Sequence, residues 1–286
     1  MSIEVKNIRY IYNEGLPQET VALDDISFRL EDGQFAGIIG HTGSGKSTLL
    51  QQLNGLLRPT SGQIFIDDTE ITAEGVSMID IRKRIGLVFQ YPEYQLFEET
   101  VAADVAFGPR NLDLAEEEIE ARVDESLRLT GLDPEAVRDK SPFELSGGQK
   151  RRAAIAGVLA MRPQVLILDE PTAGLDPQAR RDVLHMIEEV HRLQHNITIL
   201  VSHNMDDIAR LADLVLVLDG GRLTMSGTPA EVFGREAELR DIGLDIPDVT
   251  ALMRTLRQKG FAVDPDTFTV DRAEEELARC LGEGRA

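Results

Sequence analysis

The chain has 286 residues, and its 30 Lys and Arg against 50 Asp and Glu give a formal net charge of -20. At roughly 100–200 residues per domain, this length favours two domains. A chain with this negative charge is repelled by phosphodiester backbones, which disfavours a role in nucleic-acid binding. The single cysteine, Cys280, indicates a reducing cytosol, and with no run of about 18–20 apolar residues and no signal peptide we expect neither insertion nor secretion.

The first third of the chain is predicted to be mainly strand. Residues 3–12 and 21–30 are rich in β-branched and aromatic residues, and the segment 13–17 between them is typical of a turn. A short apolar run at 34–39 is followed at once by a Gly-rich loop and a helix-like segment at 48–57, which predicts the order strand, loop, helix. Further strands are expected at 63–66 and 85–89.

The middle of the chain is predicted to be helical, and the alternation of strands and helices then returns. Residues 101–137 have a helical pattern, and a second helix is expected at 149–161. Strands are predicted at 165–168, 197–201 and 214–218, with a helix at 178–193. Continuous apolar runs of this kind suit a parallel sheet that is buried on both faces, so we expect an α/β domain with a mainly helical insertion at about 95–162.

The C-terminal part is predicted to be a separate small unit. After about residue 234 the long apolar strands stop, and helix-like segments follow at 249–259 and 272–281. We therefore divide the chain into a domain at 1–233 and an extension at 234–286.

A phosphate-binding loop is the strongest chemical signal. The segment Gly40-His41-Thr42-Gly43-Ser44-Gly45-Lys46-Ser47 matches G-x-x-x-x-G-K-[ST] in full, and it lies between a predicted strand and a predicted helix. Its backbone N–H groups and the helix N-terminus favour phosphate oxygens. Lys46 is expected to reach the β- and γ-phosphates, and Ser47 to bind Mg²⁺. His41 fills a variable position. The alternative, a Gly-rich turn with an incidental lysine, does not explain this context.

Two carboxylates follow the apolar strand predicted at 165–168. Asp169 is expected to hold the magnesium ion, and Glu170 to activate or orient the attacking water. Together with the phosphate loop, this pair indicates a P-loop nucleoside triphosphatase. A kinase, a helicase and a GTPase would share both elements.

A second anion-binding loop comes about a hundred residues after the first. Leu145-Ser146-Gly147-Gly148-Gln149 precedes an amphipathic basic helix, so backbone amides are presented at a helix N-terminus. One fold is not expected to use both loops on one nucleotide. We therefore expect two chains, each of which lends this loop to the ATP of the other.

Taken together, these motifs resemble the nucleotide-binding domains of ATP-binding-cassette (ABC) proteins, in order and spacing, over about residues 3–233. The set is Gly40–Ser47, Gln90, Leu145–Gln149, Asp169-Glu170, Ala173–Asp176 and His203. The resemblance implies a P-loop fold with a parallel-sheet core, an antiparallel β subdomain and a helical insertion. The C-terminal extension is then expected to be a small α/β unit.

The resemblance also implies roles for single residues. Glu170, His203 and Gln90 would be catalytic. His203 would contact the γ-phosphate, and Gln90 would contact the metal and the water. The position of His203 agrees with this role, because it follows the carboxyl end of the strand predicted at 197–201. Ser47, Gln90 and Asp169 would hold Mg²⁺. The implied ATP-binding residues are Tyr12, Gly40, His41, Thr42, Gly43, Ser44, Gly45, Lys46, Ser47, Thr48, Ser146, Gly148, Gln149 and Asp176. Tyr12 would stack on adenine, with Tyr10 as the rival; Asp176 would lie at a dimer seam.

A finer resemblance follows Gln90. The run Phe89-Gln90-Tyr91-Pro92-Glu93-Tyr94-Gln95-Leu96-Phe97, with Val101, Asp104–Gly108 and Asn111, is similar to the ATPases of energy-coupling factor (ECF) transporters. Residues 243–247 and the following helix are similar to the short terminal domain with which those ATPases pair.

This resemblance implies a peripheral ATPase on the cytoplasmic face of the cell membrane. Two ATPases, identical or related, would drive a transmembrane coupling subunit, while a separate membrane protein captures a vitamin or a metal ion such as cobalt or nickel. An ABC transporter ATPase outside the ECF group is the first alternative. A soluble ABC ATPase that acts on DNA or ribosomes is the second, and the acidic charge and single cassette disfavour it.

Overall fold

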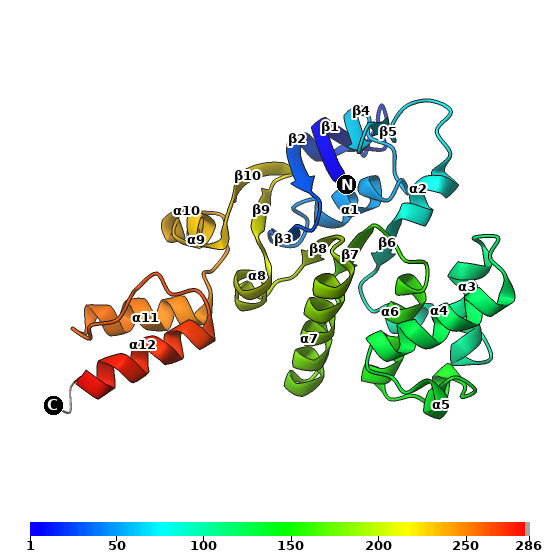
Figure 1. The fold of residues 1–286 in the computed structure, drawn as a ribbon. Helices are drawn as coiled ribbons and strands as arrows, with labels where there is room; N and C mark the ends of the chain where they lie inside the picture. The colour runs from blue at the N-terminus through cyan, green and yellow to red at the C-terminus, as the bar shows by residue number, and fades with distance from the viewer. Residues whose placement is uncertain (284–286) are drawn as a thin grey trace.

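A six-stranded sheet forms the centre of the computed structural model, which describes residues 1–283 (Figure 1). All neighbouring strands pair in parallel, except that β10 pairs with β9 antiparallel. The order is β10 (Arg222–Gly227), β9 (Leu214–Asp219), β3 (Phe35–Ile39), β8 (Ile197–Val201), β7 (Val165–Asp169), β6 (Ile85–Val88). Both β3 and β8 are buried along their whole length, as expected of apolar strands covered on both faces.

A smaller antiparallel sheet lies above the first in Figure 1. Its order is β2 (Thr20–Glu31), β1 (Ser2–Tyr12), β4 (Ser61–Ile66) and β5 (Thr69–Glu70). Ile3 and Val5 of β1 point into a shared core, and a register shift after Val5 brings Ile8 into it as well. There they pack with side chains of helix α1 (Lys46–Leu53) and of the central sheet. The predicted antiparallel β subdomain is confirmed.

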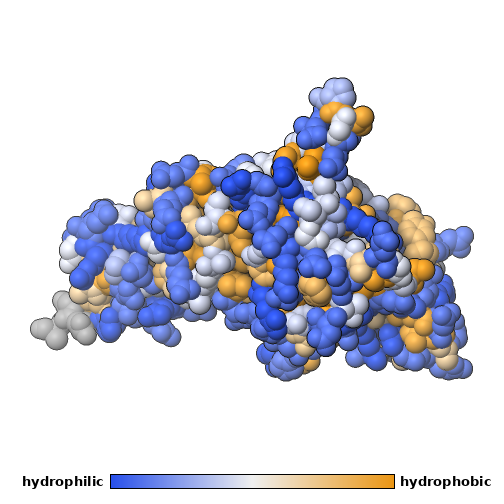
Figure 2. Space-filling view, turned by 90° about the horizontal axis from the view of Figure 1, so that it is seen from above, coloured by the Kyte–Doolittle hydropathy of each residue, from blue (hydrophilic) through white to orange (hydrophobic). Residues whose placement is uncertain are grey.

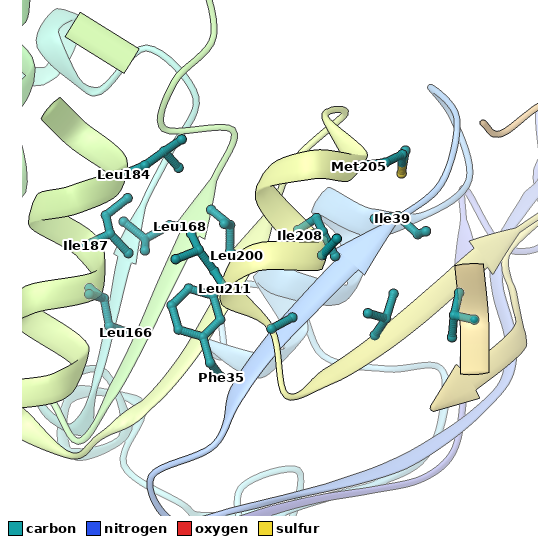
Figure 3. Packing of buried hydrophobic residues seen from close by; sticks show 14 of the residues in the cluster. Phe35, Ile39, Leu166, Leu168, Leu184, Ile187, Leu200, Met205, Ile208 and Leu211 are labelled. Atoms are coloured by element: carbon teal, nitrogen blue, oxygen red, sulfur yellow. The ribbon is translucent and has the colours of Figure 1, made fainter. Parts of the chain in front are cut away.

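Two helices cover the opposite face of the central sheet. Helices α7 (Pro177–Gln194) and α8 (Met205–Leu211) place Leu184, Ile187 and Ile208 against apolar side chains of the strands (Figure 3). The two apolar clusters therefore hold the strand ends in a fixed arrangement, and the loops that follow these strands carry most of the predicted site residues.

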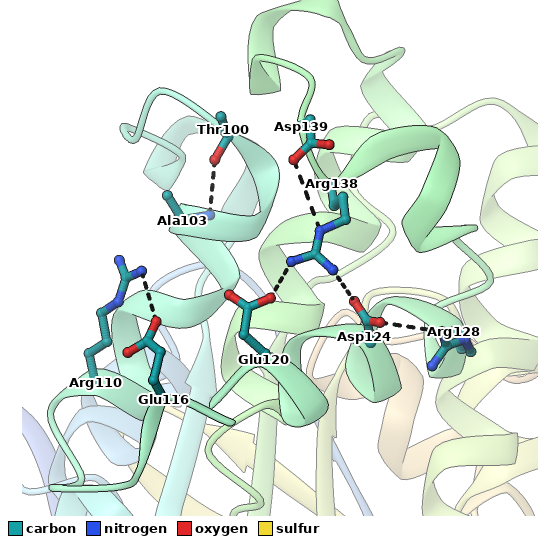
Figure 4. Close-up of polar contacts among 9 residues, drawn as sticks. All are labelled: Thr100, Ala103, Arg110, Glu116, Glu120, Asp124, Arg128, Arg138 and Asp139. Carbon is teal, nitrogen blue, oxygen red and sulfur yellow. Dashed lines mark hydrogen bonds and ion pairs between the residues drawn. The ribbon is translucent and has the colours of Figure 1, made fainter. Parts of the chain in front are cut away.

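The segment between β6 and β7 forms a helical layer with its own apolar core. Residues 101–137, predicted to be helical, are divided into three helices because Asp113 has positive φ and Asp133-Pro134 starts a new helix. Arg138 joins α4 and α5 by contacting Glu120 and Asp124, the latter at 3.2 Å (Figure 4). The helices are α2 (Met78–Arg84), which precedes β6, and then η1 (Pro92–Gln95), α3 (Val101–Arg110), α4 (Glu116–Leu129), α5 (Pro134–Val137), η2 (Pro142–Glu144) and α6 (Gly147–Leu159).

The secondary structure of the C-terminal part differs from the prediction. It was expected to be α/β, but residues 234–283 contain helices and no strand. The helices after β10 are α9 (Pro229–Phe233), α10 (Glu236–Asp241), α11 (Asp248–Gln258) and α12 (Val270–Glu283). Gly260 and Pro265 lie between α11 and α12 and disfavour a strand in this segment. In addition, the Thr250 hydroxyl donates to the Thr267 carbonyl at 2.8 Å, which occupies a backbone group that a strand would use for pairing. The division at residue 234 stays a prediction.

The extension contacts the rest of the chain at helix α8 and through Leu239, Leu244 and Ile246, which pack in the apolar cluster of the central sheet. The carboxylate of Asp206 accepts from the backbone N–H of Asp248 at 3.3 Å and of Val249 at 3.5 Å, at the start of α11. A carboxylate there stabilises the first turn of a helix. In Figure 1, α11 and α12 lie at the far side of the molecule from α3 to α6.

The surface is mainly hydrophilic on the face shown in Figure 2, as the charge of -20 leads one to expect. Within residues 1–283, no helix has the length and apolar character that crossing a bilayer requires.

Candidate functional site

The phosphate-binding loop connects β3 to α1 and encloses the Lys46 side chain. The Lys46 ammonium donates to the carbonyl oxygen of Gly40 at 2.6 Å and to that of His41 at 2.9 Å. Burial lowers the pKa of Lys46, and the nearby carboxylates of Glu170 and Asp169 act in the opposite direction. The loop thus presents a largely buried positive charge beside backbone amides, an arrangement suited to phosphate oxygens.

Two glycines of this loop are required by close approach of other segments. A Cβ on Gly40 would lie 2.3 Å from the carbonyl oxygen of Leu218 in β9. A Cβ on Gly45, whose φ is +102°, would lie 2.7 Å from the carbonyl oxygen of Ala22 in β2. The loop is therefore wedged between the two sheets, and a side chain at either position would force them apart.

Gly45→Ala is expected to lower the free energy of unfolding by about 2 kcal/mol or more, from steric overlap together with backbone strain. Denaturant unfolding measures this. Gly43→Ala is the control, because its φ is also positive (+84°) but an added Cβ meets no described atom within 4 Å. Equal stability of the two variants would contradict the wedged position of Gly45.

The carboxyl ends of β7 and β8 bring polar groups to this loop. Ser47 at the start of α1 donates to Asp169 Oδ2 at 3.1 Å. Burial raises the pKa of Asp169, while the hydrogen bond from Ser47 and the charge of Lys46 oppose that rise. The two oxygen atoms lie beside the phosphate loop and within hydrogen-bond distance of each other, so both could bind a hard cation such as Mg²⁺.

Two residues that follow neighbouring strands, Gln90 and His203, converge on the carboxylate of Glu170. Glu170, after β7, accepts from Gln90 Nε2 at 2.8 Å through Oε2, and Gln90 follows β6. His203, after β8, pairs with the other oxygen, Oε1. The carboxyl ends of adjacent parallel strands thus gather all three side chains predicted to be catalytic at one point.

A cavity of about 450 Å³ contains this convergence. Its lining residues are Tyr12, Thr20, Val21, Ala22, Thr42, Gly43, Gly45, Lys46, Ser47, Thr48, Gln90, Glu170 and His203. Thr20, Val21 and Ala22 were missed in the sequence. The signal that locates the first two is the antiparallel pairing of β1 with β2, which sets Thr20 opposite Tyr12 and Val21 opposite Ile11.

Tyr12 lines this cavity, whereas Tyr10 does not. The Tyr12 hydroxyl lies 3.1 Å from Thr48 Oγ1, and its ring meets that of Tyr10 edge to face at 4.8 Å. Tyr12 is 38% exposed, so its ring is available to stack on a planar group. The geometry favours Tyr12 over Tyr10.

Three loop residues predicted to bind ATP, Gly40, His41 and Ser44, are not among the residues that line the cavity. Gly40 and Ser44 are buried, and His41 pairs with Asp219 at 2.7 Å. Hydrogen bonds to the Thr42 carbonyl and to Asp219 raise the pKa of His41. Gly40 and Ser44 therefore shape the loop. Asp219 is a contact that the sequence did not indicate.

The second anion-binding loop is separate from the cavity within the described chain. Ser146 and Gln149 cap the start of α6 reciprocally: Ser146 N donates to Gln149 Oε1 at 3.0 Å, and Gln149 N donates to Ser146 Oγ at 3.3 Å. A Cβ on Gly148 would have Ala179 Cβ at 3.9 Å as its nearest described neighbour. Asp176, after β7, accepts from the N–H groups of Gln178 and Ala179 at the start of α7. The fold of one chain thus does not require glycine at 148.

Comparison with known proteins places the chain in a family. Residues 23–173 match the family described as ABC transporter. The chain is 58% identical to the Energy-coupling factor transporter ATP-binding protein EcfA2 of Caldanaerobacter subterraneus subsp. tengcongensis, over 98% of each chain. The structure of cbiO1 from Clostridium perfringens, described as part of the ABC transporter complex cbiONQ, covers 88% of this chain and 98% of its own, with 40% identity and a TM-score of 0.74.

A dimeric ATP-binding cassette in a post-hydrolysis state with ADP and Pi is also similar. It has 27% identity and a TM-score of 0.71, and it covers 79% of this chain and 98% of its own. The predicted ABC fold and the ATPase assignment are confirmed. The chain belongs to the ABC transporter family and, within it, to the ATP-binding proteins of energy-coupling factor transporters.

Proposed function

We propose that this chain hydrolyses MgATP in a dimer with a second ATPase chain, identical or related, and that the dimer drives a transmembrane coupling subunit on the cytoplasmic face of the cell membrane. A separate membrane subunit would capture the transported vitamin or transition-metal ion, cobalt or nickel. The observation that carries the catalytic part is the convergence of Gln90, Glu170 and His203 next to Lys46.

The phosphates and the metal ion are assigned to one side of the cavity. Lys46 would contact the β- and γ-phosphates, exchanging its carbonyl contacts for phosphate oxygens. Ser47, Asp169 and Gln90 offer oxygens to Mg²⁺, which would neutralise charge on the transferred phosphoryl group. Tyr12, which lines the same cavity, would stack on adenine.

We assign to Glu170 the activation of the attacking water. Its carboxylate is held at both oxygens, by Gln90 Nε2 and by His203 Nε2, so that its direction is set by two other strands. A carboxylate held in this way can orient a water molecule and accept its proton. Gln90 and His203 would meanwhile stabilise the water and the γ-phosphate.

The loop at the start of α6 is assigned to the nucleotide of the second chain. Ser146, Gly148 and Gln149 lie outside their own chain's cavity, and the glycine at 148 leaves the helix N-terminus open to close approach. Asp176 would lie at the seam between the chains. The similarity to a dimeric cassette with ADP and Pi supports this pairing.

The segment after Gln90 is assigned to the membrane partner. Tyr94 and Phe97 are 83% and 61% exposed, and the Phe97 ring meets exposed Phe107 edge to face at 5.1 Å. Asp104 accepts from the backbone N–H of Phe97 at 3.1 Å, which holds this aromatic surface in place. Exposed aromatic groups held in this way suit the apolar face of a partner helix.

The C-terminal extension is assigned to pairing of the two ATPases. An apolar groove of about 710 Å³ lies between α11 and α12 and is lined by Val249, Leu252, Val270, Ala273 and Leu277, with other residues at its rim. Leu252 and Val270 are exposed, so a second chain would gain apolar contact area there.

Purification from detergent-solubilised membranes tests the transport assignment. We expect integral membrane proteins to co-purify with the chain, and the double variant Tyr94→Ser, Phe97→Ser to lose them while ATP binding is kept. Leu193→Ser, an exposed apolar change at the end of α7, is the control and should keep them. Recovery with rRNA or DNA, and with no integral membrane protein, would contradict the transport function.

A further inference from the structure

Arg151, in the second turn of α6, is the largest fully buried side chain among the described residues and is only 1% exposed. Stability alone does not account for such a group, since replacing a buried ion pair by apolar residues is often neutral or stabilising. The contacts of Arg151 therefore indicate what the buried charge holds in place.

On one side, Arg151 holds the segment that follows Gln90. Its Nε donates to Glu93 Oε2 at 2.9 Å and its Nη2 to Glu93 Oε1 at 2.5 Å, a two-point contact with η1. Burial raises the pKa of Glu93, but the hydrogen bonds from Arg151, a backbone hydrogen bond and the charge of Arg151 together leave that pKa below its ordinary value. Glu93 is therefore an ionised partner, three residues after Gln90.

On the other side, Arg151 holds the segment that follows Glu170. Its Nη1 donates to the carbonyl oxygens of Ala173 at 2.7 Å and Pro171 at 3.1 Å. The backbone of Glu170 has a φ of +49° and that of Tyr91 a φ of +56°, a conformation that non-glycine residues adopt only when their surroundings impose it. One guanidinium thus ties down both left-handed turns that carry the Gln90–Glu170 contact.

The same helix begins with the loop Ser146–Gln149, so Arg151 lies between two nucleotide sites. We propose that Arg151 is a positioning residue that couples the two ATP sites of the dimer: it links the loop that contacts the second chain's nucleotide to Gln90 and Glu170 at its own nucleotide. A shift of α6 on closure then moves both segments together, and each site acquires its catalytic geometry when the other closes. This rests on the proposed action of the loop on the second chain.

Arg151→Lys tests the coupling with the least disturbance. Lysine keeps the charge beside Glu93 but lacks the fork that reaches Glu93 and both carbonyls at once. We expect unchanged ATP affinity of the single chain, and a chain that stays folded with a modest fall in Tm, because some buried hydrogen bonds are lost. We expect kcat of the assembled dimer to fall by about 10- to 100-fold, because a displacement of about 1 Å in an active site can lower the rate by this much. We also expect the Hill coefficient for ATP to fall to the non-cooperative value.

Arg128→Lys, on exposed α4, is the matched control and should hydrolyse ATP like the wild type. The double variant Arg151→Met, Glu93→Met removes the pair without leaving a buried unpaired charge and should show the same loss of kcat and cooperativity. Wild-type kcat and cooperativity in Arg151→Lys would overturn the proposal. So would a fall in Tm and ATP affinity that accounts for the lost activity in both variants.

A separate variant distinguishes failure of this coupling from failure of the proposed function. If Gly148→Asp still forms the ATP-dependent dimer, the action of the loop on the second chain is wrong, and the proposed function fails with it. If Gly148→Asp loses the dimer and Arg151→Lys hydrolyses cooperatively, only the coupling through Arg151 is overturned.

Discussion

Glu170→Gln is expected to bind ATP normally, to hydrolyse it about 100- to 10,000-fold more slowly, and to accumulate as an ATP-bound dimer. The range is that of a lost general base. The amide keeps the size of the side chain but cannot accept the proton of the water, while Lys46, Ser47 and the loop amides remain for binding. Phosphate release measures hydrolysis, and size-exclusion chromatography with ATP measures the dimer.

Glu188→Gln is the matched control, because Glu188 lies on α7 and contacts only Arg210, at 3.6 Å, among the ion pairs of the described residues. It should hydrolyse ATP at the wild-type rate. Rapid turnover by Glu170→Gln would remove Glu170 from its assigned role and would leave the contact with Gln90 and His203 as a structural one.

Gly148→Asp, introduced into the Glu170→Gln chain, is expected to abolish the ATP-dependent dimer while the single chain still binds ATP. The added carboxylate would stand at the N-terminus of α6, where the γ-phosphate of the second chain is proposed to lie, and the like charges would repel. The fold accepts the side chain, since the nearest described neighbour of the added Cβ is 3.9 Å away. A fluorescent ATP analogue measures binding and size-exclusion chromatography measures pairing.

Lys46→Ala in the same chain gives the contrasting result, loss of both ATP binding and pairing, because Lys46 belongs to its own chain's cavity. Gly75→Asp adds the same carboxylate to an exposed loop and should leave both intact. If the second ATPase is a related chain, that chain is added to every sample. An intact dimer with Gly148→Asp would contradict the action of this loop on a second nucleotide.

Local patterns were sufficient for most of the fold. The apolar runs at 165–168 and 197–201 predict buried parallel strands because each run is covered on both faces, and β7 and β8 lie there. The short elements β5, α2, β10 and α8 to α10 were missed, since two to seven residues carry too little periodicity to be distinguished from a loop. The α/β character expected for the extension came from resemblance, and no strand forms there in residues 234–283.

For the site, the sequence by itself determined which chemical groups are available and in what order, because a phosphate loop is a contiguous segment with its own glycines, lysine and helix start. The tertiary structure decided which of them meet. Gln90 and Glu170 are 80 residues apart, Glu93 and Arg151 58, and His41 and Asp219 178. Those contacts depend on the strand order β9-β3-β8-β7-β6 and on how α6 packs. The residues on each side of a contact carry no local signal for the other.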